Sequence, residues 1–314
     1  MPVPEVFRGR MRVPAIAAPM FLVSGPQLVI ATCKAGAAAA FPSLNARKTE
    51  QLDAWLSEMN ASLGTQDAPF GVNLILHPSN TRLKDDFALV VQHRVPFVVT
   101  SLGHPGDIAR AVHEYGGLVF SDIIHAHHAR KAIEAGVDGV IAVASGAGGH
   151  AGTQSAFSLI REIREFWDGV LILGGAISDG ASIRAAEVLG ADFAYMGTRF
   201  IATEESMAQP EYKQMLVDCA PRDIVYTDAV SGTNANFLLP SLERAGYTRD
   251  QLVQGSGKGK LKDLQDEAKA WRDMWSAGHG VAGIHDLPTV AELVDRLQSE
   301  YRAACALPAS AAVS

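Results

Sequence analysis

The chain has 314 residues, of which 48% are hydrophobic and 19% charged; 27 Lys and Arg against 34 Asp and Glu give a net charge of −7. This composition excludes intrinsic disorder, which requires few hydrophobic and many charged residues. The mild acidic excess is spread along the chain and leaves no basic stripe, which argues against binding to nucleic acid or to an anionic membrane.

Cysteine usage and the start of the chain indicate the compartment. Cys33, Cys219 and Cys305 are odd in number and far apart, which argues against a disulfide framework or a CxxC metal site and favours a reducing cytosol. The apolar run Val13–Val23 follows basic residues like a signal peptide, but two prolines interrupt it. No stretch reaches the ~18 apolar residues that a membrane helix needs. We therefore expect a soluble cytoplasmic protein.

Eight short apolar runs alternate with longer helical patterns. Their continuous apolar character is typical of parallel strands that are buried on both faces. The expected strands are Pro14–Ala18, Ala37–Phe41, Phe70–Leu76, Phe97–Thr100, Leu118–Ser121, Gly139–Ala142, Val170–Leu173 and Phe193–Met196. The expected helices between them are Gln27–Lys34, Glu50–Ser62, Thr81–His93, Gly106–Tyr115, Ala126–Ala135, Ser155–Trp167 and Ala181–Leu189.

The count of strands predicts the fold. Several helices are followed by a glycine suited to a left-handed C-terminal cap, at Gly36, Gly136 and Gly190. Eight strands with intervening helices predict an α/β protein with a (β/α)₈ TIM barrel. The competing architecture is a doubly wound parallel sheet, which normally has fewer strands and a single dinucleotide loop.

The strand–helix rhythm stops after Gly197. We interpret residues 203–278 as a smaller, mainly helical insertion after strand eight that forms a substrate or cover domain. Residues 1–202 and 279–314 would then form the barrel, with the helical stretch Thr289–Ala304 as its last helix. Insertions at this point lie at the C-terminal mouth of a barrel, where they can cover a ligand. The loop Gly255–Lys262 lacks the P-loop pattern and is interpreted as a mobile cover loop.

Two glycine turns follow strands seven and eight, where barrel enzymes often bind phosphate. Strand seven ends in Gly174 and Gly175, and strand eight in Gly197 and Thr198. Glycines let backbone N–H groups approach an oxyanion, and the Thr198 hydroxyl can donate a hydrogen bond. The sequence therefore predicts a phosphate site here, and the alternative is a pair of ordinary strand-to-helix turns.

Asn73 stands inside the apolar strand Phe70–Leu76. An unpaired buried amide costs about 1–3 kcal/mol, so the Asn73 side chain must find partners. It could bind a planar heterocycle at the barrel mouth, or it could bond to the backbone of a neighbouring strand.

A histidine stands in the glycine-rich loop after strand six. Small residues surround His150 in the segment Ser145–Gly152 and leave room for a substrate or cofactor against its ring. An imidazole with a pKa near ~6.5 can act as an acid or a base. We therefore predict that His150 is catalytic; a lone histidine can also be structural.

Three further histidines, His125, His127 and His128, stand where the fifth helix begins, with Asp122 nearby. A divalent metal site is one interpretation of this group. The plainer interpretation is a solvated start of a helix, so no metal is predicted.

The motifs together resemble the nitronate monooxygenases, formerly called 2-nitropropane dioxygenases. The resemblance covers roughly residues 10–205 and recurs near residue 276. The matching segments are Ala18-Pro19-Met20, Gly71-Val72-Asn73-Leu74, Gly148-Gly149-His150-Ala151-Gly152, Gly174-Gly175, Gly197-Thr198-Arg199-Phe200 and Trp275-Ser276-Ala277-Gly278.

The resemblance implies FMN as the cofactor, lying across the barrel mouth. Its phosphate would be held by Gly175, Gly197 and Thr198, beside Gly174. Met20 and Phe21 would face the reactive edge of the flavin, and Asn73 would bond the isoalloxazine. Gly148 and Gly149 would line the other side. The residues implied as cofactor-binding are therefore Met20, Phe21, Asn73, Gly148, Gly149, Gly174, Gly175, Gly197 and Thr198.

The implied reaction is oxidation of an alkyl nitronate by dioxygen to a carbonyl compound and nitrite, with His150 orienting or protonating the nitronate. The partners would be a small-molecule substrate and dioxygen, and a homodimer is permitted. One departure concerns the segment Phe120–Ile123, where some relatives carry a lysine and this chain has Asp122. An anion there would disfavour a negatively charged reduced flavin.

Two other enzyme classes stay open. Relatives of similar sequence include NAD(P)H-dependent FMN reductases that act on a quinone or an enoyl thioester. A flavin-free, phosphate-binding barrel lyase or isomerase is the third alternative. A pure binding role would leave His150 without a task.

Overall fold

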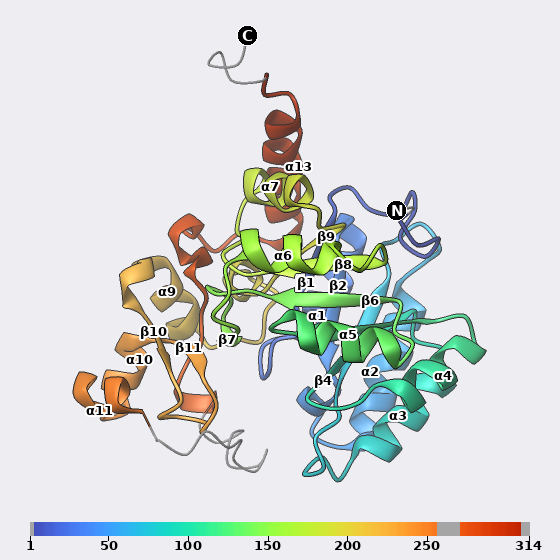
Figure 1. Cartoon of the computed structure of the whole chain (residues 1–314), viewed down its shortest axis with the longest axis horizontal. Helices are drawn as coiled ribbons and strands as arrows, with labels where there is room; N and C mark the ends of the chain where they lie inside the picture. Colours follow the sequence, from blue (N-terminus) through green and yellow to red (C-terminus); the bar gives the residue numbers. More distant parts are fainter. Residues whose placement is uncertain (1–2, 256–270, 309–314) are drawn as a thin grey trace.

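The computed structural model describes residues 3–255 and 271–308, and its centre is a closed barrel of eight parallel strands. The order around the barrel is β1-β2-β3-β4-β5-β6-β8-β9, with β9 pairing back to β1. Figure 1 shows these strands near the centre of the molecule, with helices around them. The barrel strands are β1 (Ala15–Ala17), β2 (Ala38–Pro42), β3 (Phe70–Ile75), β4 (Phe97–Ser101), β5 (Leu118–Ile123), β6 (Gly139–Val143), β8 (Val170–Gly174) and β9 (Phe193–Met196). The (β/α)₈ prediction is confirmed, and every predicted strand end lies within two residues of the observed one.

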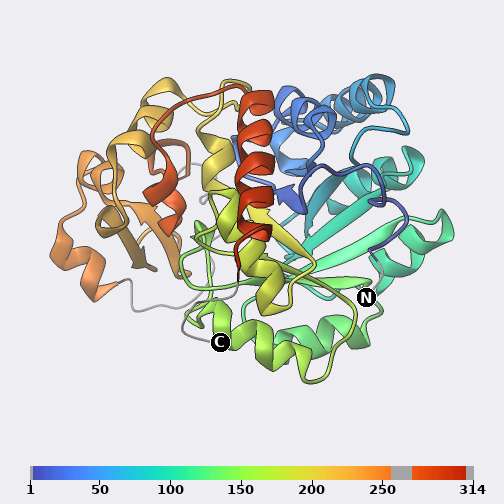
Figure 2. The same cartoon turned by 90° about the horizontal axis from the view of Figure 1, so that it is seen from above.

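Helices surround this barrel. They are α1 (Pro26–Ala35), α2 (Thr49–Ser62), α3 (Leu83–Gln92), α4 (Gly106–Glu114), α5 (Ala126–Glu134), α6 (Ala156–Arg164), α7 (Gly180–Leu189) and α8 (Thr198–Ile201). The last helix, α13 (Val290–Cys305), lies between α7 and α1 and closes the outer ring (Figure 2). Gly36 and Gly190 cap α1 and α7 in the left-handed conformation, with φ of 93° and 114°, as their positions in the sequence predict.

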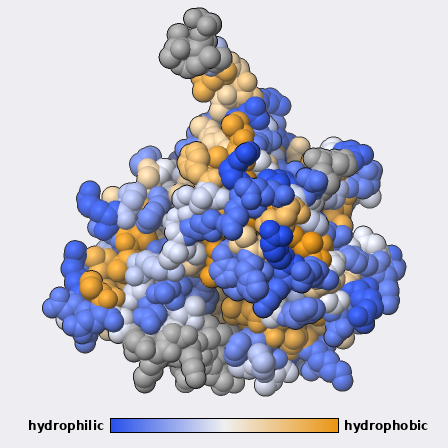
Figure 3. Space-filling view, viewed as in Figure 1, coloured by the Kyte–Doolittle hydropathy of each residue, from blue (hydrophilic) through white to orange (hydrophobic). Residues whose placement is uncertain are grey.

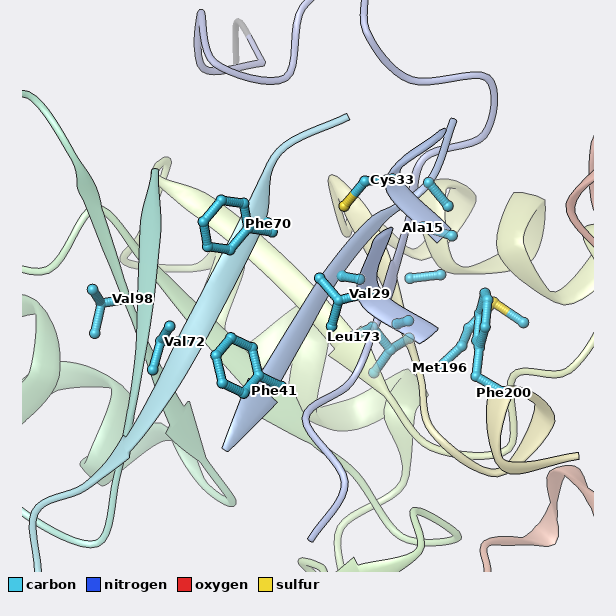
Figure 4. Packing of buried hydrophobic residues seen from close by; sticks show 14 of the residues in the cluster. Ala15, Val29, Cys33, Phe41, Phe70, Val72, Val98, Leu173, Met196 and Phe200 are labelled. Atoms are coloured by element: carbon cyan, nitrogen blue, oxygen red, sulfur yellow. The ribbon is translucent and has the colours of Figure 1, made fainter. Parts of the chain in front are cut away.

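The main hydrophobic core lies between the strands and the outer helices. Figure 4 shows part of it, where Val29 and Cys33 of α1 lie near strand residues such as Phe41 and Val72. All four side chains are almost completely buried. This layer accounts for the continuous apolar runs, because barrel strands are covered by helices outside and filled by side chains inside.

A second cluster fills the barrel interior near its N-terminal end. Phe7, from the segment before β1, stacks at 4.9–6.2 Å between ring centroids against Phe97, Phe120 and Phe193. This plug closes one end of the barrel. The open end is therefore the C-terminal mouth, where barrel enzymes have their active sites.

The segment after β9 forms a smaller unit beside the mouth. It contains α9 (Pro210–Asp218), a short 3₁₀ turn at Pro221–Asp223, β10 (Ile224–Thr227), β11 (Ala235–Leu238), α10 (Leu239–Arg244) and α11 (Arg249–Gln254). Two further 3₁₀ turns lie outside it, at Ser43–Asn45 and His279–Gly283. The two strands were not predicted. β11 pairs antiparallel with β10 and with β7 (Gly149–His150), so this unit is joined to the barrel at the predicted catalytic loop (Figure 1). The predicted cover loop after Gly255 lies almost entirely outside the described residues.

The surface carries both hydrophilic and hydrophobic residues. In Figure 3, hydrophilic residues cover most of the face shown, with smaller hydrophobic areas between them. Within residues 3–255 and 271–308, no helix is long and apolar enough to cross a bilayer.

Candidate active site

A cavity of about 900 Å³ opens at the C-terminal mouth of the barrel. This volume lies in the range of ~300–1,000 Å³ that small-molecule and cofactor sites occupy. Residues from the ends of the strands and from the smaller unit line it together. All ten residues that the sequence analysis singled out for the site line this cavity: Met20, Phe21, Asn73, Gly148, Gly149, His150, Gly174, Gly175, Gly197 and Thr198.

The floor of the cavity is a layer of polar side chains. Along a barrel strand, alternate residues point inward. The side chains of Val99, Phe120 and Phe193 are buried in the barrel interior. The residues two positions further along these strands point inward as well, and they are Ser101, Asp122 and Tyr195; Asn73 of β3 lies in the same layer. All four line the cavity. The strands therefore change from an apolar interior to a polar floor within one step of the alternation.

Hydrogen bonds within this layer fix the orientation of Asn73. Its Nδ2 group donates to the Val99 carbonyl at 3.3 Å and to Ser101 Oγ at 2.8 Å. A carbonyl can only accept, so the amide nitrogen must face β4. Both amide hydrogens are used within the protein, and Oδ1 remains for a ligand. Asn73 therefore bonds to the backbone of a neighbouring strand, one of the two alternatives that the sequence left open, and it also lines the cavity.

The network continues to a carboxyl group. Ser101 Oγ donates to Asp122 Oδ2 at 2.6 Å. Desolvation raises the pKa of Asp122 to about 6, and the Ser101 bond opposes this shift. Among the described residues, the buried Asp122 Oδ1 and the buried Tyr195 hydroxyl have no hydrogen-bond partner. Burial also raises the pKa of Tyr195, and the nearby Asp122 charge adds to that rise.

His150 also lines the cavity, from the short strand β7 that follows β6. Its residue pair in the sheet is Ala235 of β11, and the Trp271 ring meets the imidazole edge-on with 5.6 Å between centroids. Desolvation lowers the pKa of His150 to about 4. The imidazole is therefore neutral at pH 7.

The glycine turns form a wall of exposed backbone. Gly175 adopts a φ of 131°, which L-residues rarely adopt. At Gly197 an added Cβ would meet nothing closer than Met20 Sδ at 3.8 Å, so the space in front of this backbone is open. Thr198 Oγ1 accepts a hydrogen bond from the Gly278 N–H at 2.9 Å, which leaves its hydroxyl hydrogen available to a ligand.

The β1–α1 loop holds Met20 and Phe21. Asn45 Nδ2 donates to the Met20 carbonyl at 2.9 Å, and its Oδ1 accepts from the Leu22 N–H at 2.8 Å. Leu22 has a φ of 62°, an unusual conformation for leucine. A single buried amide thus fixes the backbone on either side of Phe21.

The histidines near α5 do not form a metal-binding group in the part of the chain that the structure describes. His125 caps the helix, because its Nδ1 accepts from the His128 N–H at 3.2 Å. His128 and Lys131 line the cavity. Ser101, Lys131, Tyr195 and Trp271 are among the cavity residues that were not singled out from the sequence. For Ser101 and Tyr195 the signal was available, since each continues the inward alternation of its strand.

The fold and this cavity define a barrel enzyme with a cofactor-sized site at its C-terminal face. The chain belongs to the nitronate monooxygenase family, whose model matches residues 9–300. That family consists of flavin-dependent oxidoreductases, and this chain is an enzyme of that class.

Individual relatives are distant. The chain is similar to a probable nitronate monooxygenase of Staphylococcus haemolyticus, with 28% identity over 81% of this chain and 75% of that one. It is also 27% identical to a (3aS,4S,5R,7aS)-5-hydroxy-7a-methyl-1-oxo-octahydro-1H-indene-4-carboxyl-CoA dehydrogenase of Rhodococcus jostii, over 80% of this chain and 70% of that one. Among solved structures, a nitroalkane oxidase of Streptomyces ansochromogenes superposes with a TM-score of 0.79 at 25% identity, over 96% and 99% of the two chains.

Proposed function

We propose that this chain binds FMN in the barrel-mouth cavity and oxidises alkyl nitronates with dioxygen to a carbonyl compound and nitrite. One observation carries the proposal: ten residues from separate segments, singled out by their likeness to the family's motifs, line one cavity of about 900 Å³. The family match over residues 9–300 supports the reaction type.

The residues present fit a flavin mononucleotide. The backbone N–H groups at Gly175 and Gly197 and the Thr198 hydroxyl would hold the phosphate, since glycine backbone lets an anion approach closely and the turn at Gly197 opens a helix. Asn73 Oδ1 would accept a hydrogen bond from the ring. The flavin ring would lie beside Gly148, Gly149, Met20 and Phe21. When bound, the flavin supplies the redox chemistry, and the protein supplies binding, orientation and electrostatics.

His150 would hold the nitronate. With a pKa of about 4 the imidazole is neutral at pH 7, so it does not act as a proton-donating imidazolium. A neutral ring still presents one N–H donor, which can bond a nitronate oxygen and fix the substrate. We therefore assign His150 to orienting the anion rather than to protonating it.

Residues 203–278 would act as the cover domain. The smaller unit contributes Thr233, Asn234, Trp271 and Ser276 to the cavity lining. Asn236 Nδ2 donates to the Ala147 carbonyl at 2.7 Å, which joins this unit to the loop that carries His150. Substrate selection would then depend on this unit, while the barrel holds the flavin.

Two measurements test the proposal. The purified protein should be yellow, and heat should release FMN in a ratio near one per chain, identified by chromatography. Addition of propionate-3-nitronate in air should consume dioxygen and release nitrite. A colourless protein that does not bind added FMN would contradict the cofactor, and flavin binding without nitrite release would contradict the reaction.

A second function has one observation in its favour. One relative is named as an indene-4-carboxyl-CoA dehydrogenase, and its thioester substrate supports the alternative in which this chain is an NAD(P)H-dependent FMN reductase that acts on an enoyl thioester. Anaerobic addition of NADH without nitronate separates the two. Rapid loss of the oxidised-flavin absorbance would select the reductase.

A further inference from the structure

Asp122 is a carboxyl group placed where ionisation is poorly supported. It stands on the inward face of β5, and within the described chain no lysine, arginine or histidine forms an ion pair with it. Of residues 3–255 and 271–308, only Ser101 donates a hydrogen bond to it, at Oδ2. Its other oxygen, Oδ1, is buried without a hydrogen-bond partner among the described residues. An ionised carboxylate accepts several hydrogen bonds, so this environment is much better suited to the neutral acid.

The groups around Asp122 decide how it titrates. Tyr195 of β9 is close enough that the Asp122 charge raises the pKa of its hydroxyl. The neighbouring strand β6 places only apolar side chains beside it. In the described part of the chain, the other titratable groups that line the cavity are His104, His150 and Tyr212, together with His128 and Lys131 of α5. Asn73 of β3 and Ser101 of β4 are the polar neighbours of Asp122 in the hydrogen-bonded floor.

Besides the Ser101 hydrogen bond, the open cavity favours ionisation of Asp122, because part of its side chain is exposed there. Before a ligand enters, water in the cavity can reach the polar floor, and the pKa of Asp122 is about 6. A planar ligand that covers the floor removes this water. Because desolvation disfavours the charged form of a carboxyl group, ligand binding pushes the equilibrium toward the protonated acid.

We propose that Asp122 takes up a proton when the flavin covers the floor of the cavity, so that flavin affinity is coupled to pH through this one side chain. The inference rests on the proposed function, since it needs a flavin in the cavity. A neutral Asp122 also removes the repulsion that a carboxylate would exert on the negative charge of a reduced flavin ring.

The direct test compares FMN binding by the flavin-free full chain at several pH values between 5.5 and 8.5, followed by quenching of flavin fluorescence. If only the protonated form binds well, the dissociation constant of the parent rises by up to about tenfold for each pH unit above ~6. In Asp122→Asn, which cannot ionise, this rise is absent. Titration of the FMN phosphate affects both proteins equally, and riboflavin, which has no phosphate, provides a second probe.

The variant Ser101→Ala provides an independent test of the inference. Loss of the hydrogen bond to Oδ2 removes the hydrogen bond that lowers the pKa of Asp122, so this pKa rises in the variant. The onset of weakening, that is, the pH above which FMN binding weakens, should therefore be higher than in the parent. A purely structural role for Asp122 would not shift this onset. Ser101→Ala also tests the inference if Asp122→Asn fails to fold, which circular dichroism would reveal.

The outcomes separate the two proposals. FMN binding that weakens with pH in the parent and not in Asp122→Asn supports the inference. Equal pH dependence in both proteins, or no shift of the onset in Ser101→Ala, overturns it while the flavin site stands. Absence of FMN and riboflavin binding at every pH overturns the proposed function instead, and the inference with it.

Discussion

Thr198, at the end of β9, accepts a hydrogen bond from the backbone N–H of Gly278, 80 residues further along the chain. The bond is 2.9 Å long and joins two segments that resemble family motifs, Gly197–Phe200 and Trp275–Gly278. Gly148 lies against the same place, where an added Cβ would come within 2.9 Å of the Gly278 nitrogen. The proposed phosphate turn at Gly197 and Thr198 and the loop that carries His150 therefore meet at Gly278, through the Thr198 side chain and the backbone of Gly148.

Gly197→Val tests the phosphate turn. Since an added Cβ has open space before it and the φ of −96° suits any residue, the variant should fold normally. Its side chain would project into the cavity and block the anion. We expect FMN affinity to fall by at least about a hundredfold, with an unchanged melting temperature. Gly64→Ala, at an exposed turn, is the matched control, and normal flavin content in Gly197→Val would contradict the phosphate assignment.

His150→Asn tests the substrate role. The variant should keep its flavin, because His150 is assigned to the substrate and not to the cofactor. Turnover with nitronate should fall by roughly 10²-fold, the scale expected when a group that positions the substrate is lost. His285→Asn, an exposed histidine, serves as control. Equal turnover of His150→Asn and the parent would remove His150 from the mechanism.

Asp122→Asn should also change stability, with a defined dependence on pH. The folded-state pKa of about 6 lies above the ordinary value of 3.8, so between these values the folded chain binds more protons than the unfolded one. Ionisation of Asp122 therefore costs stability that grows as the pH rises from about 4 to 6 and is constant above.

Urea unfolding of the flavin-free proteins measures this effect. At pH 7 the asparagine variant should be more stable by on the order of 3 kcal/mol, and the difference should disappear near pH 4. A difference that is the same at both pH values would show that the carboxyl does not carry a raised pKa.

Arg199→Met tests the anchor behind the phosphate turn. The guanidinium is 1% exposed and donates to the Ala202 carbonyl at 2.8 Å and to Asp286, at the backbone carbonyl and at Oδ1. Removing it leaves the buried Ala202 carbonyl without this donor, while the Asp286 carboxylate keeps Arg296, so the free energy of unfolding should fall by about 1–3 kcal/mol. Arg296→Met removes the exposed partner of the same carboxylate and should cost only ~0–1 kcal/mol. Equal losses would contradict the anchoring role.

The barrel could be predicted because its signals are local. Buried runs such as Val170–Leu173 and caps such as Gly190 are visible within a few residues, and they correspond to β8 and to the end of α7. The sheet that joins the smaller unit to the barrel could not be predicted. β7 is two residues long, and its partner β11 begins 85 residues after His150, so neither strand has a pattern of its own.

The site was predictable where glycine and histidine interrupt an apolar pattern, as at Gly175 and His150. Tyr195 was missed because an aromatic residue in a strand normally signals core, and only its inward register brings its hydroxyl to the cavity floor. Trp271 lies outside every predicted element. Its contact with His150 depends on the path of the smaller unit across the barrel mouth.

An anaerobic visible spectrum of the purified protein, titrated with propionate-3-nitronate, tests the central claim most directly. We predict an oxidised-flavin spectrum that is lost on addition of the nitronate and returns when air is admitted, with nitrite in solution. A flavin spectrum that the nitronate leaves unchanged would contradict nitronate oxidation, and a protein without flavin absorbance, even after addition of FMN, would contradict the cofactor site itself.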